Sequence, residues 1–239
     1  MKLLLISSIG LFLFGSFSRV LLCAGLAAEL TYVGMRGLAM GRLPLLGPHD
    51  TLLFFSTSIA LLALVTSFSK LLVGKRWFVT VSCFTAAFFA LLALIFPVFN
   101  MPLPQILDTL WFEAHVVLAF FAYALFAVSA TLCGGYLFNK DRELLGLQFK
   151  VALIGWSFFS ASMISGGIWG YFAWGTYWLW TAKELWTSIL WLYYALFLHL
   201  RLKGSRYDAL TPWLGILGFV VTMFTYLGVS MLMKSSHSF

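Results

Sequence analysis

The chain has 239 residues, of which 62% are apolar and only 10% are charged, and its mean hydropathy is +0.98. Soluble globular domains carry far more charge, so this composition excludes that class and indicates a protein that lies almost entirely in or against the bilayer. The net charge of +7 therefore does not indicate a nucleic-acid partner. The basic residues report instead on how the chain is oriented across the membrane.

Seven apolar stretches are long enough to cross a bilayer as helices of roughly 20 residues. In lipid the backbone must satisfy its own polar groups, and these runs are too long and too continuously apolar for barrel strands. We therefore predict an all-α, polytopic transmembrane helix bundle that forms a single integral-membrane domain over residues 1–239. The predicted spans are residues 3–28, 51–69, 77–97, 110–138, 150–170, 183–201 and 212–233.

The distribution of basic residues predicts a cytoplasmic N-terminus and an external C-terminus. In that orientation ten basic residues lie inside and four lie outside. The inner set is Lys2, Lys70, Lys75, Arg76, Lys140, Arg142, Lys150, Arg201, Lys203 and Arg206, and the outer set is Arg36, Arg42, Lys183 and Lys234. Residues 30–50 are expected to form the longest external loop.

Arg19 lies well inside the first predicted span, where an isolated charge is costly. Glu29 is ten residues further on, too far along one helix to pair with it directly. Arg19 therefore needs another partner or a cavity, or the helix is displaced so that Arg19 lies near an interface.

Tryptophan is concentrated between Trp169 and Trp191, which contains six of the chain's ten. Trp174, Trp178 and Trp180 are the closest together, in a predicted external loop with Gly175 and Tyr177. An aromatic belt at the membrane surface needs only one or two such rings per helix end. The denser cluster favours a platform for a large, flat aromatic ligand.

Two of the four histidines are predicted to reach the same outer surface as this loop. His115 begins the fourth span, with the small residues Ala119 and Ala122 one and two turns deeper, and His237 follows the last span. Imidazole is the commonest axial ligand of haem iron, so the pair would clamp a haem from both faces. The alternatives are an interfacial, hydrogen-bonded His115 and a polar tail at His237.

His199 ends the sixth span at the predicted inner face, about 24 Å from Lys183 along a helix. It would belong to a second haem site, with the other histidine supplied by a partner, or it is an interfacial histidine beside Arg201. At the other end of this span, Glu184 suits the first turn of a helix. Lys183 would pair with a haem propionate, as would Arg36 and Arg42 of the outer loop, unless these residues contact lipid headgroups.

The segment from Ser165 to Arg201 resembles the tryptophan-rich signature of the cytochrome c assembly family, most closely its CcsA/ResC branch. That signature reads roughly W-G-x-Y-W-x-W-D-P-K-E-x-W, followed by a helix ending in L-H-x-R. The matching positions are Trp174, Gly175, Tyr177, Trp178, Trp180, Lys183, Glu184, Trp186, His199 and Arg201. The resemblance is strongest over residues 110–239. Thr181 and Ala182 depart from it, because the family has an acidic residue and a proline there, and this departure bears on synthase activity more than on haem binding.

The resemblance implies that His115 and His237 are the external ligands of haem b and that His199 belongs to the inner site. It further implies a partner subunit with a large external domain of the ResB/CcsB type, apocytochrome c as the acceptor, and a multi-pass location in the bacterial inner membrane, in contact with lipid. The function expected is to carry haem and present it externally for attachment to apocytochrome c, within a haem lyase or synthase complex. Whether the chain is itself an enzyme is left open.

A second hypothesis is a haem b-containing subunit of a respiratory complex that passes electrons between quinone and external cytochromes. A third is a transporter without haem. The sequence contains no P-loop, no H-E-x-x-H and no G-x-S-x-G motif, so catalysis on a soluble substrate is poorly supported.

Overall fold

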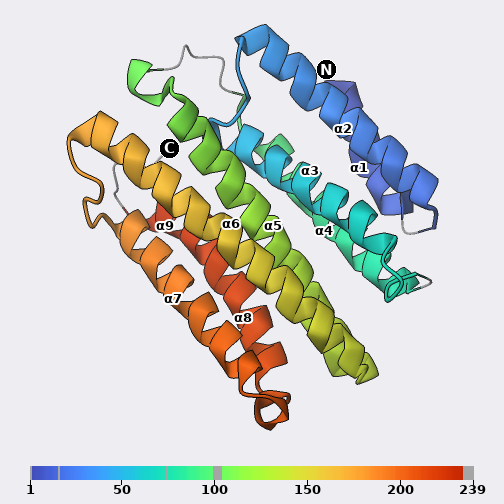
Figure 1. Cartoon of the computed structure of the whole chain (residues 1–239). Coiled ribbons are helices and arrows are strands. Elements are labelled where there is room, and N and C mark those ends of the chain that lie inside the picture. The colour runs from blue at the N-terminus through green and yellow to red at the C-terminus, as the bar shows by residue number, and fades with distance from the viewer. Residues whose placement is uncertain (1, 16, 74, 99–103, 234–239) are drawn as a thin grey trace. The chain divides into compact units, whose positions relative to one another are not determined.

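The described residues of this computed structural model, 2–15, 17–73, 75–98 and 104–233, contain helices and no strand (Figure 1). Seven helices are long and apolar enough to cross a membrane, which confirms the predicted all-α transmembrane class. They are α2 (Arg19–Met40), α3 (Gly47–Ser67), α4 (Arg76–Ile95), α5 (Leu110–Asn139), α6 (Arg142–Trp174), α7 (Ala182–Leu202) and the continuous span Thr211–Leu232. The last of these comprises α8 (Thr211–Met223), a π-helical segment (Phe224–Gly228) and α9 (Val229–Leu232).

The prediction of a single first span over residues 3–28 is wrong, because two helices share this run. Helix α1 (Lys2–Gly15) has 14 residues, or about 21 Å, and does not reach across a hydrocarbon core of about 30 Å. The chain then turns back, and Ser18 caps α2 by accepting a hydrogen bond from the Val20 amide. Hydropathy alone missed the break because both helices are apolar.

The prediction of a long loop over residues 30–50 is also largely wrong. Helix α2 continues to Met40 and ends where Gly41 adopts a left-handed φ of 67°. The glycines and prolines of this stretch suggested a loop, but Tyr32 and Arg36 are buried against neighbouring helices, and this tertiary packing outweighs the local propensity.

The turn before α2 explains Arg19, which lies at the first residue of the helix rather than inside a span. Its Nη2 donates to the Ser67 carbonyl at 3.0 Å, and its guanidinium lies 5.1 Å from the ring centroid of Phe68. Because α1 and α2 are antiparallel, Lys2 lies at the opposite end of this hairpin from Arg19 (Figure 1). The two residues therefore do not share a side, and the sidedness of the termini stays a prediction.

The chain divides into two compact units, Met1–Leu103 and Pro104–Phe239. In the first unit, α3 is the most buried helix and packs against α2 and α4, while α1 packs against α2 and α4. Close approach of α1 to α2 depends on Gly25, since a Cβ there would lie 2.8 Å from the ring of Phe12.

The second unit is built on the long antiparallel pair α5 and α6, with α7 and α8 packed beside them (Figure 1). Gly155 of α6 lets the Phe126 ring of α5 approach, and Phe126 stacks on Tyr194 of α7 with centroids 3.6 Å apart. This core holds α5, α6 and α7 together near the middle of their lengths.

Candidate functional site

His115 is held at the start of α5 by α6. Thr109 caps α5 by accepting from the Phe112 amide, which places His115 in the second turn. Its Nδ1 lies 2.8 Å from the Ser162 carbonyl, and the Ser162 hydroxyl donates back to the His115 carbonyl at 2.8 Å. Since only a protonated Nδ1 can donate to a carbonyl, the tautomer that this geometry assigns leaves Nε2 as the basic nitrogen.

The imidazole fits against α6 because residue 166 is glycine. A Cβ at Gly166 would lie 2.5 Å from Nδ1 and 2.9 Å from Cε1 of His115. Among the residues that the structure describes, Nε2 of His115 has no hydrogen-bond partner. Ser162 and Gly166 were not predicted, and the only sequence signal for them is the run of small residues from Ser160 to Gly167 on α6.

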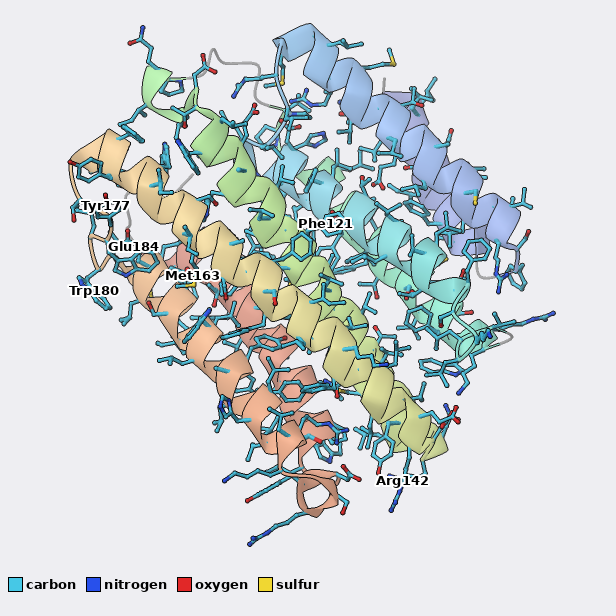
Figure 2. All side chains as sticks on the ribbon, in the orientation of Figure 1. Phe121, Arg142, Met163, Tyr177, Trp180 and Glu184 are labelled. Atoms are coloured by element: carbon cyan, nitrogen blue, oxygen red, sulfur yellow. The ribbon has the colours of Figure 1, made fainter. Side chains whose placement is uncertain are left out.

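A cavity of about 80 Å³ adjoins this imidazole and brings together several of the predicted residues. Residues of α5, α6, α7 and the α6–α7 loop line it: His115, Tyr123, Phe159, Ser162, Met163, Gly166, Trp169, Trp174, Trp178, Lys183, Glu184 and Thr187. Predicted site residues that do not line it are Gly175, Tyr177, Trp180 and His199. Figure 2 shows Tyr177 and Trp180 on the α6–α7 loop and Arg142 at the far end of α6.

The loop that covers the cavity, residues 175–181, is folded onto small residues of α6. Gly175 ends α6 with a φ of 75°, and its amide donates to the Tyr171 carbonyl. A Cβ at Gly170 would lie 3.4 Å from the Thr176 carbonyl oxygen, an ordinary contact distance, so the loop lies directly against α6 at this position. Trp180 adopts a φ of 58°, which is uncommon for a non-glycine residue and is typical of strained functional loops.

Aromatic contacts fix the other side of the loop. Trp169 packs edge-on against Trp174 with centroids 4.8 Å apart, and its indole donates to the Ile106 carbonyl at 2.7 Å. Tyr171 stacks on Tyr177 with centroids 4.7 Å apart. Tyr177 and Trp180 are exposed, whereas Trp169 is buried, so the tryptophan cluster has an inner and an outer layer.

The structure explains how Thr181 and Ala182 can replace the acidic residue and the proline of the tryptophan-rich signature. Thr181 is the N-cap of α7, and it forms a capping box with Glu184, whose Oε2 accepts from the Thr181 amide at 2.9 Å. The same oxygen accepts from the Leu179 amide at 3.0 Å, so Glu184 joins the loop to the helix. Threonine and aspartate are both good N-caps, and Ala182 takes the first helical position, where proline is favoured. Thr181 therefore fills the N-cap role that an aspartate would have there, without the charge, and its hydroxyl also donates to Glu184.

Lys183 extends from the cavity wall to the last span. Its ammonium donates to the Tyr226 carbonyl at 3.3 Å and also to the Ser230 hydroxyl. Tyr226 lies in the π-helical segment, a type of distortion that is frequent at functional sites. A cation is thus held beside the tryptophan-lined cavity, close to the point where the described chain ends.

The other predicted residues are not at this cavity. His199 is exposed, and its Nδ1 lies 2.8 Å from the Ala195 carbonyl, which again leaves Nε2 without a partner in the described parts of the chain. Arg36 is engaged in an ion pair with Asp50, and His49, expected in a loop, is buried in the first turn of α3. His237 lies outside the described residues, so its predicted role as the second ligand stays a prediction.

The fold and this site together define a class: a polytopic membrane protein that offers a basic imidazole nitrogen to a tryptophan-lined cavity at one end of a helix bundle. The sequence model of the Cytochrome C assembly protein family matches residues 49–237. The chain belongs to that family.

Individual relatives agree with this assignment. The chain is 27% identical over 222 residues to the cytochrome c biogenesis protein CcsA of Chlamydomonas reinhardtii, covering 83% of this chain and 61% of the relative. With CcsA of Prochlorococcus marinus strain MIT 9301 it shares 38% identity over 102 residues, 43% of this chain and 33% of the relative. With CcsA of strain MIT 9515 it shares 26% identity over 270 residues, which cover 95% of this chain and 83% of the relative. The chain thus spans less than two thirds of the length of the first two.

A solved structure shows the same fold. The cytochrome c haem lyase CcmF superposes with a TM-score of 0.70 and 18% sequence identity, over 98% of this chain and 45% of that chain. At this identity the likeness concerns the fold, and the chemistry must be argued from the residues.

Proposed function

We propose that this protein carries haem b at the external face of the membrane and presents it for attachment to apocytochrome c. The observation that supports this most directly is the imidazole of His115, whose Nδ1 is anchored to α6 while Nε2 is left basic beside the tryptophan-lined cavity. Membership of the Cytochrome C assembly protein family and the names of the CcsA relatives point the same way.

The donor groups of the site fit haem, but the cavity is too small to hold it in the arrangement described. Neutral imidazole whose second nitrogen is bonded to a carbonyl is a usual haem ligand, and indole rings suit the faces of a macrocycle. The cavity, however, measures about 80 Å³, well below the roughly 300–1,000 Å³ of ordinary ligand pockets. Loading would therefore require loop 175–181 to withdraw from the cavity.

Each residue then has a distinct role. His115 would bind the iron, with Ser162 orienting its ring, and Trp174 and Trp178 would cover the macrocycle and exclude water. Lys183 would pair with a propionate. When bound, the haem supplies the vinyl groups with which cysteine thiols form thioether bonds, so the protein contributes position and electrostatics.

The remaining expectations extend this proposal. His237 would be the second external ligand. His199 would contribute to an inner haem site completed by a histidine of a partner subunit, and its exposed Nε2 is consistent with such sharing. The bacterial inner membrane is the proposed location, although the Chlamydomonas relative shows that related proteins also occur in a eukaryote.

The test is haem content. Purified protein should give a b-type band in reduced-minus-oxidised spectra, and His115→Ala should weaken haem affinity by more than the roughly ten- to hundredfold that loss of a ligand's orienting partner costs. Added imidazole should restore the band in that variant. His49→Gln, at a buried histidine of the other unit, is the matched control and should leave the band unchanged. Equal haem content in wild type and His115→Ala would refute the ligand assignment.

Co-expression with an apocytochrome and the partner subunit separates synthesis from electron transfer. Covalent haem attachment that depends on this chain supports the proposal. Full haem loading without any attachment would favour the respiratory subunit instead.

A further inference from the structure

A second group of buried polar residues lies in the first unit and takes no part in the proposed haem site. Glu29 is in the middle of α2 and is completely buried. Tyr32 and Arg36 follow it three and seven residues later, so all three lie on one face of the helix. An ionisable residue inside a membrane span is costly, which makes it a candidate for function.

The outer part of this group is fully paired. Arg36 donates to both oxygens of Asp50 at 2.7 Å, and the Tyr32 hydroxyl lies 2.9 Å from Nε2 of His49. Nδ1 of His49 lies 2.8 Å from the Ala93 carbonyl. His49 therefore carries its hydrogen on Nδ1 and accepts a hydrogen bond from the Tyr32 hydroxyl at Nε2, so it is neutral and, unlike His115, has no nitrogen left to bind a metal.

Glu29 differs, because among the described residues neither of its carboxyl oxygens has a hydrogen-bond partner of ordinary geometry. The side chains beside it are Ser56 and Thr57 of α3. The Ser56 hydroxyl donates to the Ala86 carbonyl at 2.9 Å, and the Thr57 hydroxyl donates to the Leu53 carbonyl at 2.9 Å. Each hydroxyl has one hydrogen, so both present only acceptor lone pairs to Glu29.

This arrangement does not suit a carboxylate, which needs donors or a cation when it is buried. It suits a protonated carboxyl, which brings its own hydrogen and can donate it to either hydroxyl oxygen. We infer that Glu29, Ser56 and Thr57 form a proton-binding site within the membrane-spanning part of the first unit. On loading, the carboxylate gains one proton and its charge is neutralised; on release, the proton leaves and the charge returns.

Access to the site is from the end that holds Arg36 and Asp50. On α2 and α3, polar residues continue from Glu29 in that direction, through Tyr32 and His49, whereas residues 20–28 of α2 and 59–65 of α3 are apolar. The titratable and charged groups on the helices of this unit are Lys2 on α1; Arg19, Cys23, Tyr32 and Arg36 on α2; His49 and Asp50 on α3; and Arg76 and Cys83 on α4. Neither α1 nor α4 carries an acidic residue, so Glu29 and Asp50 are the two acidic residues in the described part of this unit.

Infrared spectroscopy of the full chain in lipid vesicles tests the site directly. The carbonyl band of a protonated carboxylic acid should be present in wild type, shift in D₂O and be absent from Glu29→Gln. This change is nearly isosteric, and its amide supplies the hydrogen that the acid would donate. Glu29→Asp, which should keep a band at a shifted frequency, covers the case in which the glutamine variant does not fold. Glu143→Gln, at an exposed position of α6, should leave the band unchanged.

Two outcomes would overturn the inference. One is an unchanged acid band in Glu29→Gln. The other is a wild-type band that is absent in sodium buffer and present in choline buffer, since Glu29 would then bind sodium rather than a proton. The access route is tested by Tyr32→Phe, which should slow hydrogen–deuterium exchange of the band about tenfold, a factor equal to about 1.4 kcal/mol in the barrier. An exchange rate equal to that of wild type would exclude the route through Tyr32.

Discussion

Replacement of Gly166 by alanine is predicted to displace His115 without altering any polar group. The new Cβ would lie 2.5 Å from Nδ1, 2.9 Å from Cε1 and 3.1 Å from Cγ of the imidazole, all inside normal contact distance. The ring must therefore turn away, and its 2.8 Å hydrogen bond to the Ser162 carbonyl is lost.

The expected energy follows from opposing contributions. Loss of the buried hydrogen bond costs about 1–3 kcal/mol and overpacking a similar amount, while alanine gains up to about 1 kcal/mol over glycine in a helix. The net destabilisation should be about 1–5 kcal/mol, and haem affinity should fall about ten- to a hundredfold because the ligand loses its orienting partner.

The assay pairs this variant with Gly146→Ala on the same helix. A Cβ at Gly146 would meet nothing within 4 Å, so that variant should be as stable as wild type or slightly more stable. Thermal unfolding in detergent and a spectroscopic haem titration measure the two effects. If Gly166→Ala has the same unfolding temperature and the same haem affinity as Gly146→Ala, then Gly166 does not position His115 through packing.

Two further changes test the loop and the first unit. Thr181→Ala should cost about 1 kcal/mol through loss of the N-cap and speed proteolysis of loop 175–181. Thr181→Asp keeps the cap but loses the hydroxyl hydrogen bond to Glu184, so its cleavage rate should lie between those of wild type and the alanine variant; equal cleavage rates in all three would contradict the capping role. Asp50→Ala should destabilise by about 3–5 kcal/mol in a denaturant titration because the buried Arg36 loses its ion-pair partner, while Arg36→Met combined with Asp50→Leu should cost much less. A double variant as unstable as the sum of the single changes would show that the two residues act independently.

Hydropathy was sufficient to predict the number of spans, since each run exceeds the length that a bilayer requires. It was not sufficient at the N-terminus, where one apolar run holds two antiparallel helices and the end of α1 at Gly15 and the N-cap at Ser18 do not interrupt the apolar run. Residues 30–40 were expected in a loop on the strength of their glycines, and their helical state depends on burial of Tyr32 and Arg36 by other parts of the unit.

The candidate site shows the same division between local and long-range information. His115, Trp174 and Trp178 stood out by residue type and spacing, and the structure brings them to one cavity. Ser162 and Gly166 could not be predicted, because their importance arises only when α6 lies against α5. The same holds for Glu29, whose nearest polar neighbours are contributed by a different helix.

The two residues of the capping box at the start of α7 differ in how readily other side chains can replace them. At position 181 any short side chain with an acceptor oxygen suffices, so threonine and aspartate are interchangeable there as far as the backbone is concerned. Position 184 is more restricted, because one oxygen of Glu184 accepts from the amides of Leu179 and Thr181 and from the Thr181 hydroxyl, and only glutamine offers an acceptor oxygen at the same reach. The end of the loop next to α7 is thus fastened by a single carboxylate, whereas the end next to α6 is held separately by the stack of Tyr171 on Tyr177. Loss of the acceptor at position 184 would therefore free one end of the loop and leave the other attached.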